Sequence, residues 1–176
     1  INLPKTLVLE DAEAIATQVP TVDKVAPQLQ SRELVTYRNK NTYSTLVGTT
    51  PEYTSVRNFD ADRGRFLNKL DLKRSDRVVT LGSDLANRLF GNQNPVGKQV
   101  RIKNVAFSVI GVMESKGSVL GTNYDDSAYI PVSTMASRII GKNSPYGVNL
   151  TFISVSAKND ASVEAASFQI RNLLRL

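Results

Sequence analysis

The sequence predicts an α+β fold with antiparallel or mixed sheets. Amphipathic helices and strand-like runs follow one another without strict alternation, so a regular βαβ architecture is not indicated. Pairs of strand-like segments joined by short polar turns recur, which is typical of β-hairpins. A helix next to a strand stands at each end of the chain. We expect these two end units to pair across a domain whose middle is an insertion.

Composition excludes several kinds of chemistry. The 176 residues are 41% hydrophobic, which is enough to bury a core in one domain or two small ones. The chain contains no Cys and no His, so it lacks the usual metal ligands, nucleophile–base pairs and disulfides. The net charge of +6 is spread widely. Its densest basic group, residues 69–77, is interrupted by acids; it is interpreted as a solvated face, with anionic lipid or nucleic acid as alternatives.

The ends of the sequence look like cut points. No signal peptide and no run of about 20 apolar residues is visible. The chain begins abruptly at Ile1 and stops on NLLRL, inside an apparent helix. Natural domains seldom end on an uncapped apolar turn, so we expect a piece of a longer protein.

The first half predicts a helix, a hairpin and a short helix. Apolar residues at helical spacing predict a helix over 9–19, ended by Pro20. Residues 22–37, which alternate after Pro27, predict an extended strand, and the polar turn 38–41 leads to a returning strand over 42–50. Within 51–60 we expect a short helix capped by Thr50.

The middle changes period partway. A short buried strand over 78–81 is followed by a helix that we expect Ser83 or Asp84 to cap and Gly91 to end. Residues 98–115 predict a hairpin that turns at Lys103 and Asn104. Residues 116–127 are rich in Gly, Ser, Asn and Asp and predict a long loop.

The last third predicts two strand–helix pairs. A strand over 128–131 ends at Pro131 and precedes a helix that we expect Ser133 to cap. A strand over 150–158 precedes an amphipathic helix over 161–176. The residues of that helix expected to face inward are Val163, Ala166, Phe168, Ile170, Leu173 and Leu174.

Residues 94–102, NPVGKQVRI, contain a Gly97-Lys98 pair that resembles part of a phosphate-binding loop. Such a loop needs a Ser or Thr after the Lys and a helix beyond it. Here Gln99 follows, and a strand pattern comes next. The pair is therefore interpreted as part of a turn that Pro95 and Gly97 shape before the strand.

Three carboxylate pairs are candidates for catalytic or metal sites. Asp60/Asp62 and Asp71/Asp76 lie among basic residues and are interpreted as surface ion pairs. Asp125-Asp126 ends the long loop and is expected to satisfy turn backbone, with a divalent-metal site as the alternative. No nucleophile signature is present, which argues against catalysis. A soluble hydrolase or metal-dependent enzyme is kept as the hypothesis from another functional class. We expect no catalytic residue, no metal site and no cofactor in this chain.

Scattered aromatic residues do not indicate nucleic-acid binding, because core and hairpin packing explains them better. The loop over 115–124 is different, since Val119 and Leu120 have no obvious core role. An apolar pair in a Gly-rich loop is either disordered or a docking tip. The residues predicted to contact a partner there are Lys116, Val119, Leu120, Asn123 and Tyr124.

Several stretches together resemble one family. They are LEDAEAI, VAPQLQ, GTTPEYTSVRNFDADRGRFL, VVTLGSDLANRLFGNQNPVGKQVRIKNVAFSVIGVMESKG and DDSAYIPVSTMASRI. Their residues and order resemble the extracytoplasmic (periplasmic) core domain of MacB-type ABC transporter permeases, which carry an FtsX-like membrane region. The match covers nearly the whole chain, and the run from Leu81 to Gly117 is its most specific part.

The resemblance implies a two-lobed fold. A discontinuous lobe similar to the porter domains of multidrug efflux pumps, built of β-α-β units, would take 1–72 and 141–176. A small α/β lobe would be inserted over 73–140. Crossings near 63–76 and 140–149 would form a bistable hinge.

The resemblance also implies a function and partners. The chain would be a non-catalytic module on the periplasmic or extracytoplasmic face of the inner membrane, anchored through flanking transmembrane helices. It would transmit ATP-driven movement of those helices to efflux or export of substrate, with ATP hydrolysis in a separate cytoplasmic domain. The implied partners are a second permease copy, making a homodimer, and a periplasmic adaptor (membrane fusion) protein. The alternative is a lipoprotein-releasing or peptide-sensing FtsX-like permease.

Overall fold

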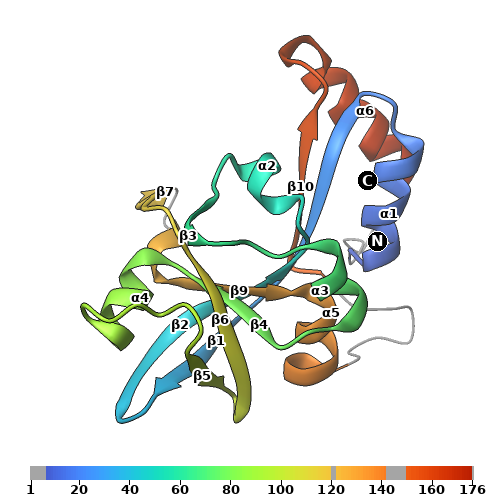
Figure 1. Ribbon diagram of the computed structural model, residues 1–176. Helices are drawn as coiled ribbons and strands as arrows, with labels where there is room; N and C mark the ends of the chain where they lie inside the picture. Colours follow the sequence, from blue (N-terminus) through green and yellow to red (C-terminus); the bar gives the residue numbers. More distant parts are fainter. Residues whose placement is uncertain (1–6, 120–121, 142–149, 176) are drawn as a thin grey trace.

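The computed structural model describes residues 7–119, 122–141 and 150–175, and Figure 1 shows their arrangement. The helices are α1 (Leu9–Gln18), α2 (Tyr53–Arg57), α3 (Lys69–Arg74), α4 (Ser83–Phe90), α5 (Val132–Thr134), the π-helical turn η2 (Met135–Ile140) and α6 (Val163–Leu174), with 3₁₀ turns η1 (Tyr124–Asp126) and η3 (Asp160–Ser162). The strands are β1 (Val22–Tyr37), β2 (Lys40–Thr49), β3 (Ala61–Gly64), β4 (Val78–Leu81), β5 (Gln99–Ile102), β6 (Val105–Met113), β7 (Ser118–Val119), β8 (Thr122–Asn123), β9 (Ser127–Pro131) and β10 (Phe152–Ala157). The predicted α+β class is confirmed.

Six strands of the main sheet close into a barrel. Their order is β1-β2-β9-β4-β6-β5, and β5 returns to pair with β1. The β2–β9 and β4–β6 pairs are parallel and the other pairs in the ring are antiparallel, so the sheet is mixed as predicted. Closure removes the open edges that an extended sheet would leave unpaired.

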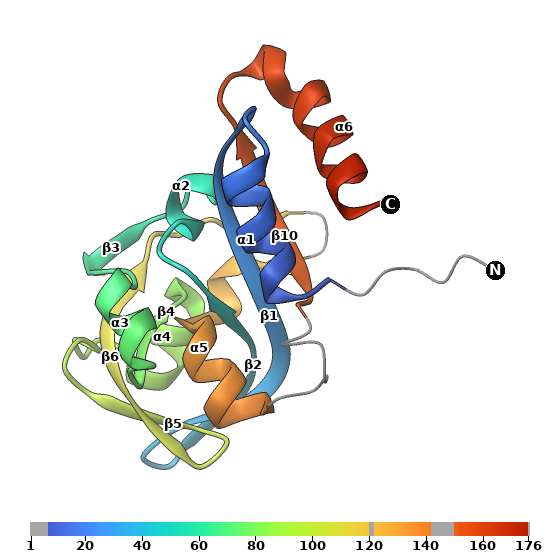
Figure 2. The same cartoon turned by 90° about the vertical axis from the view of Figure 1, so that its right-hand side faces the viewer.

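Strand β1 belongs to two structural units. Its first half, from Val22 to Gln28, pairs antiparallel with β10, and its second half, from Leu29 to Tyr37, pairs with β2. Helices α1 and α6 contact each other, and α1 packs against β1, beside this first half (Figure 2). The predicted pairing of the two end units is therefore confirmed.

Two apolar clusters lie on opposite faces of the barrel strands. Leu46 and Val112 belong to the larger cluster, which fills the barrel and continues under α1 and α6. Their sequence neighbours Val47 and Met113 belong to a second cluster rich in aromatic rings. This alternation follows from the two-residue period of a strand, so both faces of the sheet are buried here.

Most of the predicted elements are confirmed. Helix α1 and strand β2 end within about two residues of the predicted bounds, and β1 spans 22–37 as predicted. The β5–β6 hairpin turns at Lys103 and Asn104, whose φ angles of 49° and 64° are those of a two-residue primed turn. Gly91 ends α4 with a φ of 58°.

All three predicted side-chain caps are wrong. Helix α2 begins at Tyr53 after Glu52, and Thr50 meets it only through its backbone carbonyl. Gly82 is the N-cap of α4 and offers no side chain. Ser133 lies inside α5, where its hydroxyl donates to the carbonyl of Leu72 at 2.7 Å. Tertiary packing sets where these short helices begin, and it overrides the local preference for a capping side chain.

The loop predicted over 116–127 is partly regular, with the β7–β8 hairpin followed by η1. Helix α6 differs from prediction on its apolar face. Ala166 and Leu174 are buried as expected, but Val163 is 55% exposed and Phe168 is 66% exposed. Val163 lines an apolar hollow together with Val22 of β1 and Val155 of β10, and this hollow is open to solvent.

The main sheet crosses the predicted lobe boundary. Strands β1 and β2, from the range 1–72, are hydrogen-bonded to β5 and β9, from the range 73–140. The division into lobes 1–72 with 141–176 and 73–140 stays a prediction. The crossing predicted near 140–149 lies almost wholly outside the described residues.

Candidate partner-contact loop

The loop between β6 and β9 holds the residues predicted to contact a partner. Ser118 pairs with Asn123 and Val119 with Thr122, which makes a short antiparallel ladder. Leu120 lies outside the described residues. In Figure 1 this hairpin projects on the opposite side of the barrel from α1 and α6. A contact made here would therefore be far from the two end helices.

Asp125 holds the base of the loop together. Its Oδ1 accepts the backbone N–H of Lys116 at 2.7 Å, and its Oδ2 accepts the N–H of Gly117 at 2.8 Å and the hydroxyl of Ser115 at 3.1 Å. The side chain is buried, with 5% of the residue exposed. The predicted role of Asp125 in satisfying turn backbone is confirmed, because three donors converge on this carboxylate.

Lys116 points back toward the domain. Its Nζ donates to the carbonyl of Arg57 at 2.7 Å and lies 5.0 Å from the ring centroid of Phe59 and 5.5 Å from that of Tyr124. The Arg57 guanidinium lies 5.9 Å from the Tyr124 centroid. Two cations therefore share one aromatic surface at the base of the hairpin, where the ring faces stabilise positive charge.

Asp126 fixes the other side of the base. It forms an ion pair with Arg88 on α4 and accepts the hydroxyl of Ser44 on β2 at 3.0 Å. Gly82, just before α4, donates to the carbonyl of Ser127 at 2.7 Å. The hairpin is thus carried by a base tied to β2 and α4, which suits a preorganised contact surface.

The predicted contact residues divide into two kinds. Tyr124 is buried and Lys116 is half-buried, so both support the loop from beneath, while Asn123 is exposed. Val119 lies in β7, and its side chain is outside the described part of the chain. Sequence reasoning missed Arg57 and Phe59. They lie almost 60 positions before Lys116 in the chain, and no local signal links them to this loop.

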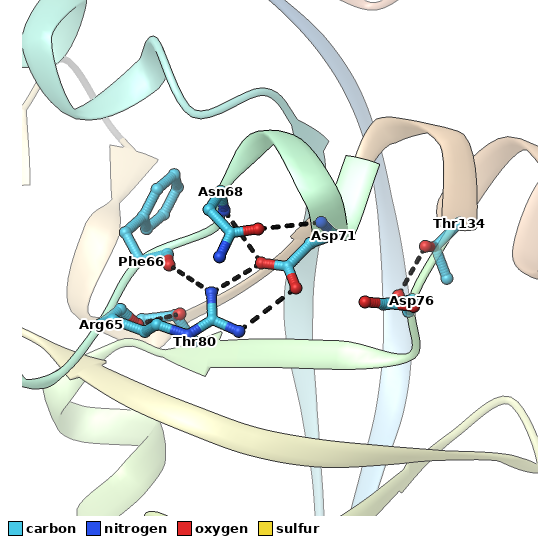
Figure 3. A network of polar contacts seen from close by, with 7 residues as sticks. All are labelled: Arg65, Phe66, Asn68, Asp71, Asp76, Thr80 and Thr134. Atoms are coloured by element: carbon cyan, nitrogen blue, oxygen red, sulfur yellow. Dashed lines mark hydrogen bonds and ion pairs between the residues drawn. The ribbon is translucent and has the colours of Figure 1, made fainter. Parts of the chain in front are cut away.

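The crossing from β3 to β4 carries a connected polar network (Figure 3). Arg65 donates to Asp71 through Nη1 at 2.7 Å and Nη2 at 3.2 Å, and Nη1 also donates to the carbonyl of Phe66 at 3.1 Å. Asn68 and Asp71 cap α3 reciprocally, with both N–H···O distances at 2.9 Å. Thr80 on β4 donates to the carbonyl of Arg65 at 3.0 Å.

This network corrects the interpretation of Asp71 as a surface residue. Only 3% of Asp71 is exposed, whereas 45% of the Arg65 side chain is. Burial opposes ionisation of Asp71, but the hydrogen bonds from Arg65 and from the Asn68 N–H outweigh it and hold the pKa of Asp71 below its ordinary value. The same hydrogen bonds, which Arg65 donates and Asp71 accepts, raise the pKa of Arg65. Asp71 is therefore an ionised, buried anchor for α3.

The aromatic cluster beneath the loop contains two tyrosines with shifted ionisation. Tyr53 and Tyr129 have ring centroids 5.3 Å apart, and the Tyr129 hydroxyl donates to the carbonyl of Tyr124 at 3.3 Å. Burial raises the pKa of Tyr53 to about 12 and raises the pKa of Tyr129 well above its ordinary value. Both hydroxyls stay protonated at any ordinary pH and act as structural groups.

Comparison with known proteins identifies the family. A family model described as the MacB-like periplasmic core domain matches residues 2–173. This chain belongs to the MacB-like periplasmic core domain family.

Relatives and solved structures agree with this assignment. The macrolide export ATP-binding/permease protein MacB of Syntrophobacter fumaroxidans is 34% identical over 154 residues, and that of Bdellovibrio bacteriovorus is 33% identical over 135 residues. These matches cover 86% and 77% of this chain and 21% of each relative. The chain therefore spans about a fifth of the length of the curated relatives it matches.

The crystal structure of the periplasmic region of MacB from Actinobacillus actinomycetemcomitans matches with a TM-score of 0.84 and 26% identity, covering 98% of this chain and 74% of that one. The extracellular domain of the ABC-type transporter YknZ from Gram-positive bacteria has the same fold, with a TM-score of 0.79 and 21% identity over 97% of this chain and 85% of that one.

The described ranges of this MacB-like domain contain neither a membrane-spanning helix nor a metal-binding cluster. None of the helices there is both long enough and apolar enough to cross a membrane. No group of three or more His, Cys, Asp or Glu side chains among those residues is arranged to hold a metal ion. In the MacB-like domain the carboxylate of Asp125 is instead occupied by three donors of its own chain.

Proposed function

We propose that this MacB-like domain is the non-catalytic, extracytoplasmic module of an ABC transporter permease. It transmits ATP-driven movement of flanking transmembrane helices to the export of a substrate. ATP hydrolysis takes place in a separate cytoplasmic domain. The partners are a second permease copy and a periplasmic adaptor protein. Membership of the MacB-like family supports this proposal.

The division of β1 between two units is the observation that carries the proposal. A movement applied to the end unit, where α1 and α6 lie, reaches the barrel through a continuous strand of 16 residues. No flexible linker intervenes along that path. The β7–β8 hairpin stands on the opposite side of the barrel, on a base tied to β2 and α4 (Figure 1). Such a connection suits mechanical transmission.

Exposed apolar side chains support contact with a second permease copy through the end unit. Of the seven large hydrophobic residues that are exposed in the described part of the chain, four lie on β10 and α6. They are Phe152, Val155, Val163 and Phe168. Apolar side chains concentrated in this way commonly mark an interaction surface.

Spin labels test the transmission. The 176 residues contain no Cys, so Gln18→Cys on α1 and Asn39→Cys at the β1–β2 turn place labels on the two units, in a full-length protein from which any other cysteine has been replaced. We expect the label distances between the two copies, or within one copy, to change when ATP binds and to recover after hydrolysis. A change within one copy would locate a hinge between the units. If ATP changed neither the distances between copies nor those within one copy, transmission would be refuted.

A pull-down tests the adaptor contact. We expect Leu120→Asp in the full-length permease to reduce recovery of a tagged adaptor, with Tyr43→Asp as the matched control, because Tyr43 is 63% exposed on β2. Equal recovery with Leu120→Asp and with the unchanged protein would exclude a docking role for the loop. Recovery of a lipoprotein carrier in place of the adaptor would favour the lipoprotein-releasing alternative.

A further inference from the structure

An apolar groove lies between the end unit and the barrel. One wall is α1, with Leu9 and Ala16, and the base is β1, with Val25. The opposite wall is formed by Leu72 of α3 and Ala136 of η2. Its volume of about 320 Å³ lies near the lower end of the range for small-molecule sites, which is roughly 300–1,000 Å³.

The charges around this groove are all negative. Glu13 on α1 and Glu52 before α2 are its only charged lining residues among those described. Neither carboxylate takes part in an ion pair or a side-chain hydrogen bond within the described part of the chain. The chain as a whole has 22 basic residues against 16 acidic ones, so an acidic rim runs against the overall charge. Apolar walls with unpaired carboxylates complement a ligand that is both hydrophobic and cationic.

The α3–α5 wall is held in place by polar contacts. Ser133, which lines the groove, donates to the carbonyl of Leu72 at 2.7 Å. Thr134 donates to the carbonyl of Asp76 at 2.7 Å, and the pair of Arg65 with Asp71 fixes α3 (Figure 3). The groove therefore has one preformed wall, which lowers the cost of ordering a bound ligand.

The groove wall also contains an unsatisfied polar group. Thr50 lines the groove, and its buried Oγ1 has no hydrogen-bond partner within the described residues. A buried hydroxyl without a partner is unfavourable in a finished core. This wall is therefore not packed as a closed core would be.

We propose that the groove binds a small cationic amphiphile. The apolar tail lies between α1 and the α3–α5 wall, and the cationic head lies against Glu13 and Glu52. The small volume favours such a ligand, or one arm of a larger one, over a protein segment. Because the ligand contacts both α1 and the barrel helices, it bridges the two units. This proposal does not depend on the adaptor or on the second permease copy.

Three probes with one tail test the proposal on the 176-residue chain, since a related periplasmic region was crystallised without its membrane part. They are octyltrimethylammonium, octyl glucoside and octyl sulfate, each below its critical micelle concentration. Calorimetry is expected to give saturable binding of the cation, about five- to tenfold tighter than of the neutral probe. Equal affinity for the cationic and neutral probes, or preference for the sulfate, would overturn the proposal.

Paired variants locate the binding. Ala16→Phe fills the groove from an exposed position on α1 and is expected to abolish binding of the cation. Thr17→Phe, next to it on the exposed side and outside the groove, is the matched control and should bind as the unchanged chain does. The double variant Glu13→Gln/Glu52→Gln should remove the preference for the cation while keeping the fold, since neither carboxylate has a side-chain partner among the residues that the structure describes. Retained binding in Ala16→Phe, with circular dichroism unchanged, would place the ligand elsewhere and refute the groove.

Discussion

Arg65 donates hydrogen bonds to Asp71 through both terminal nitrogens, although the carboxylate is buried and the guanidinium is nearly half exposed. The pair is strengthened because Asp71 also accepts the N–H of Asn68. Thr80 on β4 donates to the backbone carbonyl of Arg65, and this hydrogen bond joins the pair and α3 to the barrel. Asp71, which the sequence predicts to be a surface residue, is buried and anchors helix α3.

Replacing Asp71 by Asn removes the charge that accepts three hydrogen bonds. We expect Asp71→Asn to lower the free energy of unfolding by about 2 kcal/mol, measured by urea denaturation. Asp62→Asn, at an exposed position on the preceding strand β3, should change it by less than about 0.5 kcal/mol. Equal effects of the two variants would show that the Arg65–Asp71 pair contributes nothing specific.

The same pair makes stability depend on acid pH. The pKa of Asp71 is lower in the folded chain than its ordinary value of 3.8, so the pair contributes fully above that value. Its contribution should be lost as the pH falls below about 4 toward the depressed pKa of the folded chain. Urea midpoints measured across this range should fall more steeply for the unchanged protein than for Asp71→Asn. Parallel curves would assign the acid sensitivity to other carboxylates.

Alkaline pH should destabilise the aromatic cluster. In the folded chain the pKa of Tyr53 is about 12, whereas in the unfolded chain this hydroxyl ionises near its ordinary pKa of 10.0. Since the folded state holds more protons between these values, stability should fall as the pH rises above 10. Absorbance at alkaline pH should show late ionisation, and Tyr53→Phe should remove part of that late signal. A spectrum complete near pH 10 in the folded protein would contradict the burial of these hydroxyls.

Two glycines in strands should respond differently to a methyl group. A Cβ on Gly111 would lie 2.2 Å from the carbonyl oxygen of Arg65, and one on Gly48 would lie 2.7 Å from Met135 side-chain atoms. Backbone cannot move aside as a Met side chain can, so Gly111→Ala should cost about 3 kcal/mol and Gly48→Ala about 1 kcal/mol. Thermal unfolding of both variants checks the order, and the reverse order would contradict the close approach at Gly111.

Phe168 separates packing from partner contact. Because its side chain is exposed, Phe168→Ser should change the unfolding free energy by less than about 0.5 kcal/mol. In the full-length permease it should weaken crosslinking between copies through the end unit. Leu174→Ala, which empties a buried position, should cost about 2–4 kcal/mol and serves as the packing control. Unchanged crosslinking with Phe168→Ser would exclude this side chain from the proposed contact between copies.

Local patterns in the sequence predict most of the elements but not their assembly. The spacing of Leu85, Leu89 and Phe90 predicts α4, and the alternation around Phe107 predicts β6, because both depend on neighbouring residues. Closure of the barrel depends on β5 meeting β1, more than 60 positions away in the chain. No local period contains that information.

The candidate loop shows the same limit. Asp125 was predicted to satisfy turn backbone because Asp does so in many turns, and its donors lie within ten residues. The contacts of Lys116 with Arg57 and Phe59 join segments almost 60 positions apart, and nothing near Lys116 indicates them. The misplaced inward face of α6 has a related cause, since periodicity tells which residues are apolar but not how much surface is there to cover them.

The sharing of β1 has a consequence for anyone who wishes to exchange parts between members of this family. Neither unit can be excised with a single pair of cuts, because each would be left without the strand that completes its sheet. A chimera that grafts a foreign barrel onto this end unit must carry the whole of Val22–Tyr37 and must match β10 at one end of it and β2 and β5 at the other. The two units must therefore be exchanged together, because both depend on the sixteen residues of β1.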